Sequence, residues 1–205
     1  MITVIGNLKG GTGKSTVAFN LSLWVATHRN VYMAVYDLDP QATLTDALDI
    51  RAEDGYSPSI EVIQDVNELG SEGNNAEVIV DIGMSDMKAM KEALKRADRI
   101  LVPIGPSQAD VWSTQRFLKL VKESRNGKAI EIIGFMNRAD THRAVRETDE
   151  AFEALETLEG LQMMDVRLYQ RTAYRRSFSE GLAVFELDKK SKAAQEVLEF
   201  GGELY

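Results

Sequence analysis

The stretch from Asn7 to Thr16, NLKGGTGKST, combines closely spaced glycines with two lysines and hydroxyl side chains. Backbone N–H groups of a glycine-rich turn that opens a helix bind anions, and the helix dipole strengthens this attraction. Lys14 is expected to reach the β- and γ-phosphates of a nucleotide, and the Ser15 hydroxyl is expected to ligate Mg²⁺. The stretch therefore predicts a phosphate-binding loop whose nucleotide contacts are Lys9, Gly10, Gly11, Thr12, Gly13, Lys14, Ser15 and Thr16.

One position departs from the strict pattern G-x-x-x-x-G-K-[ST]. The pattern requires glycine where this chain has Leu8, and Lys9 follows at a position with no fixed residue. A flexible turn capped by Ser15 is the structural alternative. It does not explain why a strand pattern, glycines, a lysine, a hydroxyl and a helix pattern follow one another in this order.

Carboxylates end two of the apolar segments. Asp37 and Asp39 end VYMAVYDLD, and Asp81 ends EVIVD. Ligands of parallel sheets lie outside the carboxyl ends of the strands, where a metal-bound triphosphate also needs acids. We expect Asp81 to hold Mg²⁺ through water, and we expect one of Asp37 and Asp39 near the metal and the other near the attacking water. Asp39 could instead cap a helix that has Pro40 at its first position.

Two further polar positions follow later strand patterns. Asp110, in PSQAD, is either the acidic end of a capping box begun by Ser107 or a catalytic residue. The tetrapeptide NRAD, from Asn137 to Asp140, resembles the N-K-x-D motif with which GTPases read a base, with arginine at the lysine position. A polar turn is the commoner explanation for such a tetrapeptide, and Asn137 is kept as a candidate base contact.

Apolar strand patterns alternate with helical patterns along the whole chain. We predict strands at 2–7, 31–39, 77–83, 99–105 and 129–137, with a weaker one at 162–166. Helices are predicted at 15–28, 41–48, 84–97, 109–125, 172–179 and 191–200, with a possible helix at 60–69. This alternation predicts an α/β fold in one domain, 1–205, with a mostly parallel twisted sheet and helices on both faces.

Composition excludes several classes of protein. The 205 residues include no cysteine, which excludes a disulfide framework, a thiolate-bound iron–sulfur cluster and a cysteine nucleophile. The net charge of −8 argues against a surface covered by nucleic acid, although it allows a local basic patch. No apolar run is long enough to span a membrane, and a strand pattern begins at Ile2, so we expect a cytoplasmic protein.

The segments KGGTGKST, DLDPQ and IVDIG together resemble the ParA/MinD family of deviant Walker A ATPases, and the resemblance covers nearly the whole chain. In that family the lysine at the position of Lys9 is the signature residue. The resemblance implies ATP and Mg²⁺ as cofactors, and a homodimer that forms on ATP binding and encloses two ATP molecules. Each signature lysine then reaches the phosphates held by the partner subunit.

The resemblance also assigns roles to the acids. Asp39 corresponds to the acid needed for hydrolysis, Asp37 to a switch acid near Mg²⁺, and Asp81 to the acid that holds Mg²⁺. The expected metal site is therefore Ser15, Asp37 and Asp81, and the expected catalytic residues are Lys9, Lys14 and Asp39. The segment IGMSD after Asp81 departs from the family, because many members have a proline-containing sequence there.

The C-terminal quarter of the chain favours one branch of the family. MinD-like members end in a basic amphipathic helix that binds membranes, whereas the tail AAQEVLEFGGELY has no basic residue, and we expect no membrane binding. Basic residues gather instead between Arg167 and Lys192, where ParA proteins bind DNA. A solvated charged face is the alternative. Nonspecific contacts to DNA phosphates are expected from Arg171, Arg175, Arg176, Lys189, Lys190 and Lys192.

These features and the resemblance together predict a partition ATPase. Such a protein forms its ATP dimer on the nucleoid and positions a cargo, which is a plasmid or a protein body such as a carboxysome. A ParB-like or cargo-adaptor partner stimulates hydrolysis and releases the dimer. The alternatives are a metabolic ATP-dependent enzyme of the same superfamily, similar to dethiobiotin synthetase, a MinD-like membrane protein, and a GTPase that reads its base through Asn137 and Asp140.

Overall fold

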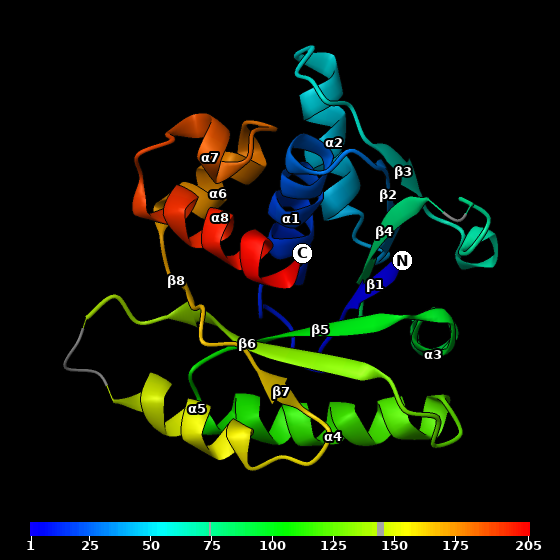
Figure 1. The fold of residues 1–205 in the computed structure, drawn as a ribbon, viewed down its shortest axis with the longest axis vertical. Helices are drawn as coiled ribbons and strands as arrows, with labels where there is room; N and C mark the ends of the chain where they lie inside the picture. Colours follow the sequence, from blue (N-terminus) through cyan, green and yellow to red (C-terminus); the bar gives the residue numbers. More distant parts are fainter. Residues whose placement is uncertain (74, 143–145) are drawn as a thin grey trace.

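The computed structural model describes residues 1–73, 75–142 and 146–205. A sheet runs through its centre with the strand order β3-β2-β4-β1-β5-β6-β7 (Figure 1). Its strand pairs are parallel throughout these residues, which confirms the predicted α/β fold. The strands predicted from the sequence are β1 (Ile2–Ile5), β2 (Tyr32–Leu38), β4 (Ala76–Ile82), β5 (Arg99–Ile104), β6 (Glu131–Ala139) and the short β7 (Gln162–Met163).

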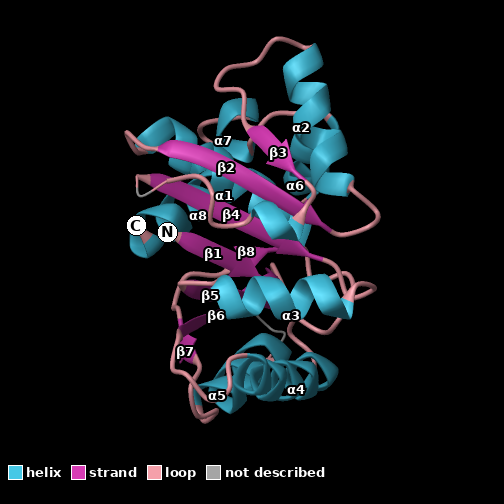
Figure 2. Ribbon diagram, turned by 90° about the vertical axis from the view of Figure 1, so that its right-hand side faces the viewer, coloured by secondary structure: helices cyan, strands magenta, loops and turns pink. Residues whose placement is uncertain are grey.

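Helices cover both faces of the sheet, as predicted (Figures 1 and 2). One face packs against α1 (Lys14–His28), α2 (Thr43–Glu53), α6 (Thr172–Ser179), α7 (Val184–Leu187) and α8 (Lys192–Leu204). The opposite face packs against α3 (Met87–Arg96), α4 (Gln108–Ser124) and α5 (Glu147–Glu156). The sequence patterns do not indicate α5 or α7, and the others lie close to their predicted ranges.

The possible helix at 60–69 is wrong. This segment forms the edge strand β3 (Glu61–Ile63), which pairs with β2, followed by a 3₁₀ turn, η1 (Val66–Glu68). Val62 and Ile63 are β-branched and pack against the two apolar cores, so pairing with the open edge of β2 overrides the local helical pattern. A further short strand, β8 (Leu168–Tyr169), pairs with the end of β6.

The order of the strands brings three chain segments to one edge of the sheet. In the pairing register, Ile5 at the end of β1 and Asp37 in β2 both lie beside Asp81 in β4. The loop after β1 and the acids of β2 and β4 therefore leave the sheet at the same level. Ligands of open α/β sheets bind outside this carboxyl edge.

Helix α8 packs closely on α1. A Cβ atom at Gly201 would lie 2.4 Å from the indole ring of Trp24, so only glycine allows this approach. The ring of Phe200 lies 4.6 Å from that of Phe135 in the sheet, measured between centroids. The apolar side of α8 is thus covered by the core. Within the described residues, the structure contains no helix that is both long and apolar enough to cross a membrane.

A buried arginine connects α2 to α7 and to the turn that precedes α7. Arg51 is 1% exposed and donates hydrogen bonds of 2.8 and 2.9 Å to the two carboxylate oxygens of Glu186. It also donates to the carbonyl oxygens of Gly181, at 3.0 Å, and Pro58, at 2.8 Å. Because a buried charge is costly without its partner, this pair fixes the C-terminal segment to α2.

Substitution of Glu186 by alanine should destabilise the fold strongly. The change leaves the Arg51 guanidinium buried without its carboxylate, which is expected to cost about 3–5 kcal/mol of unfolding free energy. The matched control is Glu180→Ala, whose partner Arg176 is 69% exposed and whose loss should cost less than about 1 kcal/mol. Urea unfolding measures both. Equal losses in the two variants would contradict the structural role of Arg51.

Candidate functional site

The predicted phosphate loop connects β1 to α1, as its motif requires. Gly11 and Gly13 have φ angles of +72° and +86°, a backbone conformation that favours glycine. Gly13 is the N-cap residue of α1, and the first turn of this helix carries no acidic side chain. The positive end of the helix and the N–H groups of the loop therefore remain available to an anion.

Three side chains outside the motif support the loop. The buried amide of Asn7 accepts a hydrogen bond of 3.1 Å from the Lys9 amide and donates one of 3.0 Å to the Pro103 carbonyl. The Asn137 amide donates to the Thr12 carbonyl at 2.6 Å. Arg138 donates to a carbonyl of the loop, that of Gly11, as well. The sequence gives no signal for Asn7 or Arg138 in this role.

Asn137, the predicted base contact, also has a structural role. Its amide nitrogen is already bonded to the loop, and a Cβ atom at Gly13 would lie 2.6 Å from that nitrogen. Asn137 therefore fixes the loop backbone and at the same time lines a hollow next to it. The base contact itself stays a prediction.

Two hollows flank the loop and share Gly11, Gly13 and Thr16. One has a volume of about 450 Å³ and is lined by the loop glycines, by polar side chains and by two large apolar ones; the polar side chains include Lys14, Ser15, Asp39, Gln41 and Thr43, and the apolar ones are Met84 and Phe178. The other has a volume of about 340 Å³ and combines apolar with polar side chains, including Val17, Leu168, Tyr169, Tyr174, Asn137 and Gln170. A hollow with many polar side chains next to a more apolar one suits the phosphates and the base of a nucleotide.

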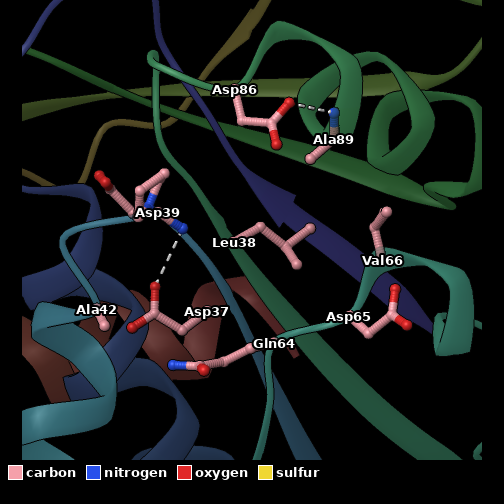
Figure 3. Close-up of a pocket in the computed structure, with 10 residues that line it drawn as sticks. Asp37, Leu38, Asp39, Ala42, Gln64, Asp65, Val66, Asp86 and Ala89 are labelled. Atoms are coloured by element: carbon pink, nitrogen blue, oxygen red, sulfur yellow. Dashed lines mark hydrogen bonds between the residues drawn. The ribbon is translucent and has the colours of Figure 1, made fainter.

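Asp37 in β2 and Asp39 just after it differ in their hydrogen bonds. Asp37 is buried and accepts hydrogen bonds of 2.9 Å from both the amide and the hydroxyl of Thr45, in the first turn of α2. Its other oxygen accepts the amide of Asp39 at 3.2 Å (Figure 3). Asp37 therefore anchors the start of α2 to the sheet edge, a role that the sequence does not indicate.

Asp39 is not the N-cap of α2. Its carboxylate accepts the amide of Gln41 at 3.1 Å in a turn, and the N-cap residue of the helix is Ala42. The end of β4 passes close by, since a Cβ atom at Gly83 would lie 2.6 Å from the Asp39 carboxyl carbon. Asp39 also lines the polar hollow. This excludes the capping alternative and leaves its carboxylate beside the loop.

Figure 3 shows a third hollow, which is acidic and is lined by Asp37 and Asp39. Asp65 and Asp86 also line it. Asp65 accepts the amide of Asn67, and Asp86 accepts the amides of Lys88 and Ala89, so each caps the helical turn that follows it. Helix capping accounts for the positions of both acids.

Asp81 is buried more completely than the other two acids of the site. It is fully buried, and neither carboxylate oxygen has a hydrogen-bond partner among the described residues. Burial raises the pKa of Asp81 to about 7; Asp37 and Asp39 act in the same direction, and Ser15 and Lys14 oppose them. An unpaired carboxylate next to a phosphate loop fits a hydrated cation. No three acidic or histidine side chains of the described residues could hold a metal by themselves, so phosphate and water would complete its shell.

The two lysines of the loop have different surroundings. Lys14 is buried at the start of α1 and lines the polar hollow. The side chain of Lys9 is 39% exposed, and its ammonium group donates to Asp110 at 2.7 Å and to the Ser107 hydroxyl at 3.2 Å. Ser107 is the N-cap of α4 and accepts the amide of Asp110, which is one half of the predicted capping box. The Asp110 carboxylate itself contacts the Ser107 hydroxyl and Lys9.

The basic residues of the C-terminal quarter lie on α6, α8 and the turn before α8. Arg171 is held by Glu196, with 2.7 Å between Nε and Oε1, and is only partly exposed. Arg176 pairs with Glu180 on the surface of α6. Arg175, Lys189, Lys190 and Lys192 are exposed. The structure thus brings the predicted DNA-binding residues onto neighbouring elements but ties Arg171 to α8.

Replacement of Asp81 by asparagine should change the pH dependence of stability in a Mg²⁺-free buffer. The folded-state pKa of about 7 lies above the ordinary value, so the folded protein binds the proton more tightly than the unfolded chain. The contribution of Asp81 to the stability of the wild type should therefore fall between about pH 4 and pH 7, by up to about 4 kcal/mol. Denaturant titrations across this range should show a flatter profile for Asp81→Asn, and the exposed-site control Asp46→Asn should keep the wild-type profile. Parallel profiles would contradict the assignment.

Comparison with known proteins agrees with this geometry. The chain is 26% identical over 200 residues to the maintenance of carboxysome distribution protein A of Halothiobacillus neapolitanus, which covers 93% of this chain and 89% of that protein. It is 28% identical over 191 residues to a protein ParA of Rhizobium radiobacter, which covers 88% of this chain and 83% of that one.

Solved structures show the same fold. The structure of Cyanthece apo McdA superimposes with a TM-score of 0.79 at 19% identity and covers 98% of both chains. The sequence profile described as the CobQ/CobB/MinD/ParA nucleotide binding domain matches residues 3–184, which include the phosphate loop, the three acids and Asn137. The chain therefore belongs to the CobQ/CobB/MinD/ParA family of nucleotide-binding domains.

Proposed function

We propose that this ParA/MinD-type ATPase forms an ATP-bound homodimer that binds DNA nonspecifically on the nucleoid and partitions or positions a cargo. The main support for this proposal is the different exposure of the two lysines of the loop. Lys14 is buried inside the site, whereas Lys9 lies at its surface. A loop that served only its own nucleotide would need only Lys14. A second cation on the outer side suits a nucleotide held by another subunit.

The chemistry proposed for the site is hydrolysis of ATP. Lys14 and the loop N–H groups would neutralise the phosphates, and Asp39, beside the polar hollow, would orient the attacking water. Ser15 would ligate Mg²⁺, with Asp81 and Asp37 binding its water molecules. When bound, Mg²⁺ would neutralise charge on the β- and γ-phosphates and would give Asp81 the positive charge that its buried carboxylate lacks.

The DNA-binding proposal rests on exposed charge. Arg175, Arg176, Lys189, Lys190 and Lys192 are exposed on α6, on α8 and on the turn before α8, in a chain whose net charge is −8. Helix α7 contacts both α6 and α8, and the three helices lie together in Figure 1, so these residues can form one surface. Arg171 would contribute less, because Glu196 already neutralises it. Contacts of this kind go to phosphates and carry no sequence information.

The cargo is proposed from the relatives. One relative is named for carboxysome distribution and another is a ParA protein, and the cargo here would be a protein body or a plasmid. A ParB-like or cargo-bound adaptor would stimulate hydrolysis and release the dimer from DNA. Membrane binding is not proposed, because the apolar side of α8 is packed against the core and its exposed end carries Glu203.

Nucleotide-dependent dimerisation tests the first part of the proposal. In gel filtration, the wild type should shift to the dimer position with non-hydrolysable ATP and Mg²⁺, and Lys9→Ala should shift less because it lacks the cation for the partner's phosphates. Lys128→Ala, an exposed lysine that precedes β6 at the opposite edge of the sheet, is the control and should behave as wild type. A dimer that depends on neither nucleotide nor Lys9 would overturn this proposal.

DNA retention tests the second part. The double variant Arg175→Ala/Arg176→Ala should lose retention of nonspecific DNA with ATP. Because Arg175 also lines the partly apolar hollow beside the loop, ATP binding by the variant is measured separately and must persist for the loss to be assigned to the DNA surface. Wild-type retention should weaken steeply as salt is raised, because binding releases counterions from the phosphates. The control removes two exposed basic residues of α4, Arg116→Ala/Lys119→Ala, and should retain DNA. Undiminished binding by the α6 variant at moderate salt would refute the surface. Fast turnover that requires a small carboxylate and no DNA would favour a metabolic enzyme instead.

A further inference from the structure

The ammonium group of Lys9 is bound by its own chain. It lies 2.7 Å from the Asp110 carboxylate and 3.2 Å from the Ser107 hydroxyl, both at the start of α4. The Asp110 side chain is only 5% exposed, and a Cβ atom at Gly105 would lie 2.9 Å from its carboxylate. Glycine at this position therefore provides the space in which the acid meets the lysine.

The loop and α4 are also connected beside this pair. The side-chain oxygen of Asn7 accepts both the Lys9 amide, at 3.1 Å, and the hydroxyl of Ser113 in α4, at 3.0 Å. This bond holds the backbone of Lys9 at a fixed distance from α4. The long side chain alone can then turn between Asp110 and a position outside the chain, without movement of the loop.

Asp110 does not depend on Lys9 for its charge. It is the third residue of α4, where the helix dipole favours an acid, and it is also hydrogen-bonded to Ser107. A buried acid without such support would strongly resist loss of its cation. Here the helix end and the hydroxyl remain when the lysine leaves. The ion pair is therefore strong enough to hold Lys9 and weak enough to be exchanged for a triphosphate, which carries more negative charge.

We propose that Asp110 is a cis latch for Lys9: it holds the lysine within its own subunit until the phosphates of a nucleotide bound to a second copy replace it. Asp110 lines neither of the two hollows beside the loop, so it positions Lys9 and takes no part in the chemistry. The latch raises the threshold for dimerisation and keeps single subunits from associating at low nucleotide occupancy. This inference rests on the proposed function, because it assigns a regulator to the lysine that the dimer uses.

The latch predicts that its removal favours the dimer. Asp110→Asn should make release of each lysine easier. For a partly exposed ion pair, the equilibrium constant for release should rise by about 5-fold. Two lysines are released per dimer, so the dimer dissociation constant with non-hydrolysable ATP and Mg²⁺ should fall by about 25-fold. Sedimentation equilibrium measures this constant directly.

Asp149→Asn is the matched control. Asp149 is also the third residue of a helix, α5, and also pairs with a basic residue, Arg167, at 2.6 Å. This variant reproduces the loss of an acid at a helix start and of an ion pair, but does not affect Lys9. Its dimer dissociation constant should equal that of the wild type. Urea unfolding of both variants shows whether either loses its fold.

A second measurement examines the ion pair without any dimer. Lysine acetylation with a limiting reagent, followed by peptide mass spectrometry, gives the reaction rate of Lys9 in the nucleotide-free protein. We expect slow modification in the wild type, faster modification in Asp110→Asn, and wild-type behaviour in Asp149→Asn. Lys9 is the residue compared, and exposed Lys128 provides the internal standard in every sample.

The possible results distinguish failure of the latch from failure of the proposed function. If the wild type dimerises with nucleotide and Asp110→Asn dimerises equally or less well, the latch is refuted and the proposed function stands. If no variant dimerises, the proposed function fails, and the latch fails with it. If Lys9 reacts equally fast in the wild type and in Asp110→Asn, the ion pair does not restrain the lysine and the latch is refuted in either case.

Discussion

The parallel register of β4 between β1 and β2 is the constraint on which the site depends. It sets Asp81 beside both Asp37 and the end of β1, so that a loop that attracts anions and two acids that attract cations leave the sheet at one level. A shift of one residue in either pairing would turn the acids toward the opposite face of the sheet. The hydrophobic cores on both faces include side chains of all three strands, and this packing holds the strands in that register.

The same arrangement leaves the site electrostatically incomplete. Burial raises the pKa of Asp81, while the positive end of α1 carries no compensating acid in its first turn. Without a bound ligand, both the buried carboxyl group of Asp81 and the uncompensated positive end of α1 reduce the stability of the fold. Together they match a ligand that carries negative phosphates and a divalent cation, because each charge of the ligand then meets its opposite. The affinity of the site arises from charges that the fold keeps unpaired.

The sequence predicts the sheet, most of the helices and the motif residues, because apolar periodicity and a glycine-rich loop are local signals. It does not predict the side chains that hold the loop and the acids in place by hydrogen bonds. Asn7, Thr45 and Arg138 act through contacts with residues distant in sequence or through the geometry of a turn, which no spacing reveals. The segment 60–69 fails for the same reason, since its structure is decided by the neighbouring strand β2. The capping pattern at Ser107 predicts one role of Asp110 and gives no sign of its contact with Lys9.

Arg51 and Glu186 limit how relatives of this chain can diverge. The two residues are 135 positions apart, yet loss of either one alone leaves a buried charge, whereas replacement of both by apolar side chains of similar volume removes the charge altogether. If the two residues are replaced one at a time, the intermediate protein with a single substitution is much less stable. These two positions should therefore change together across the family, as a correlated pair in a sequence alignment, even though neither contacts the nucleotide site.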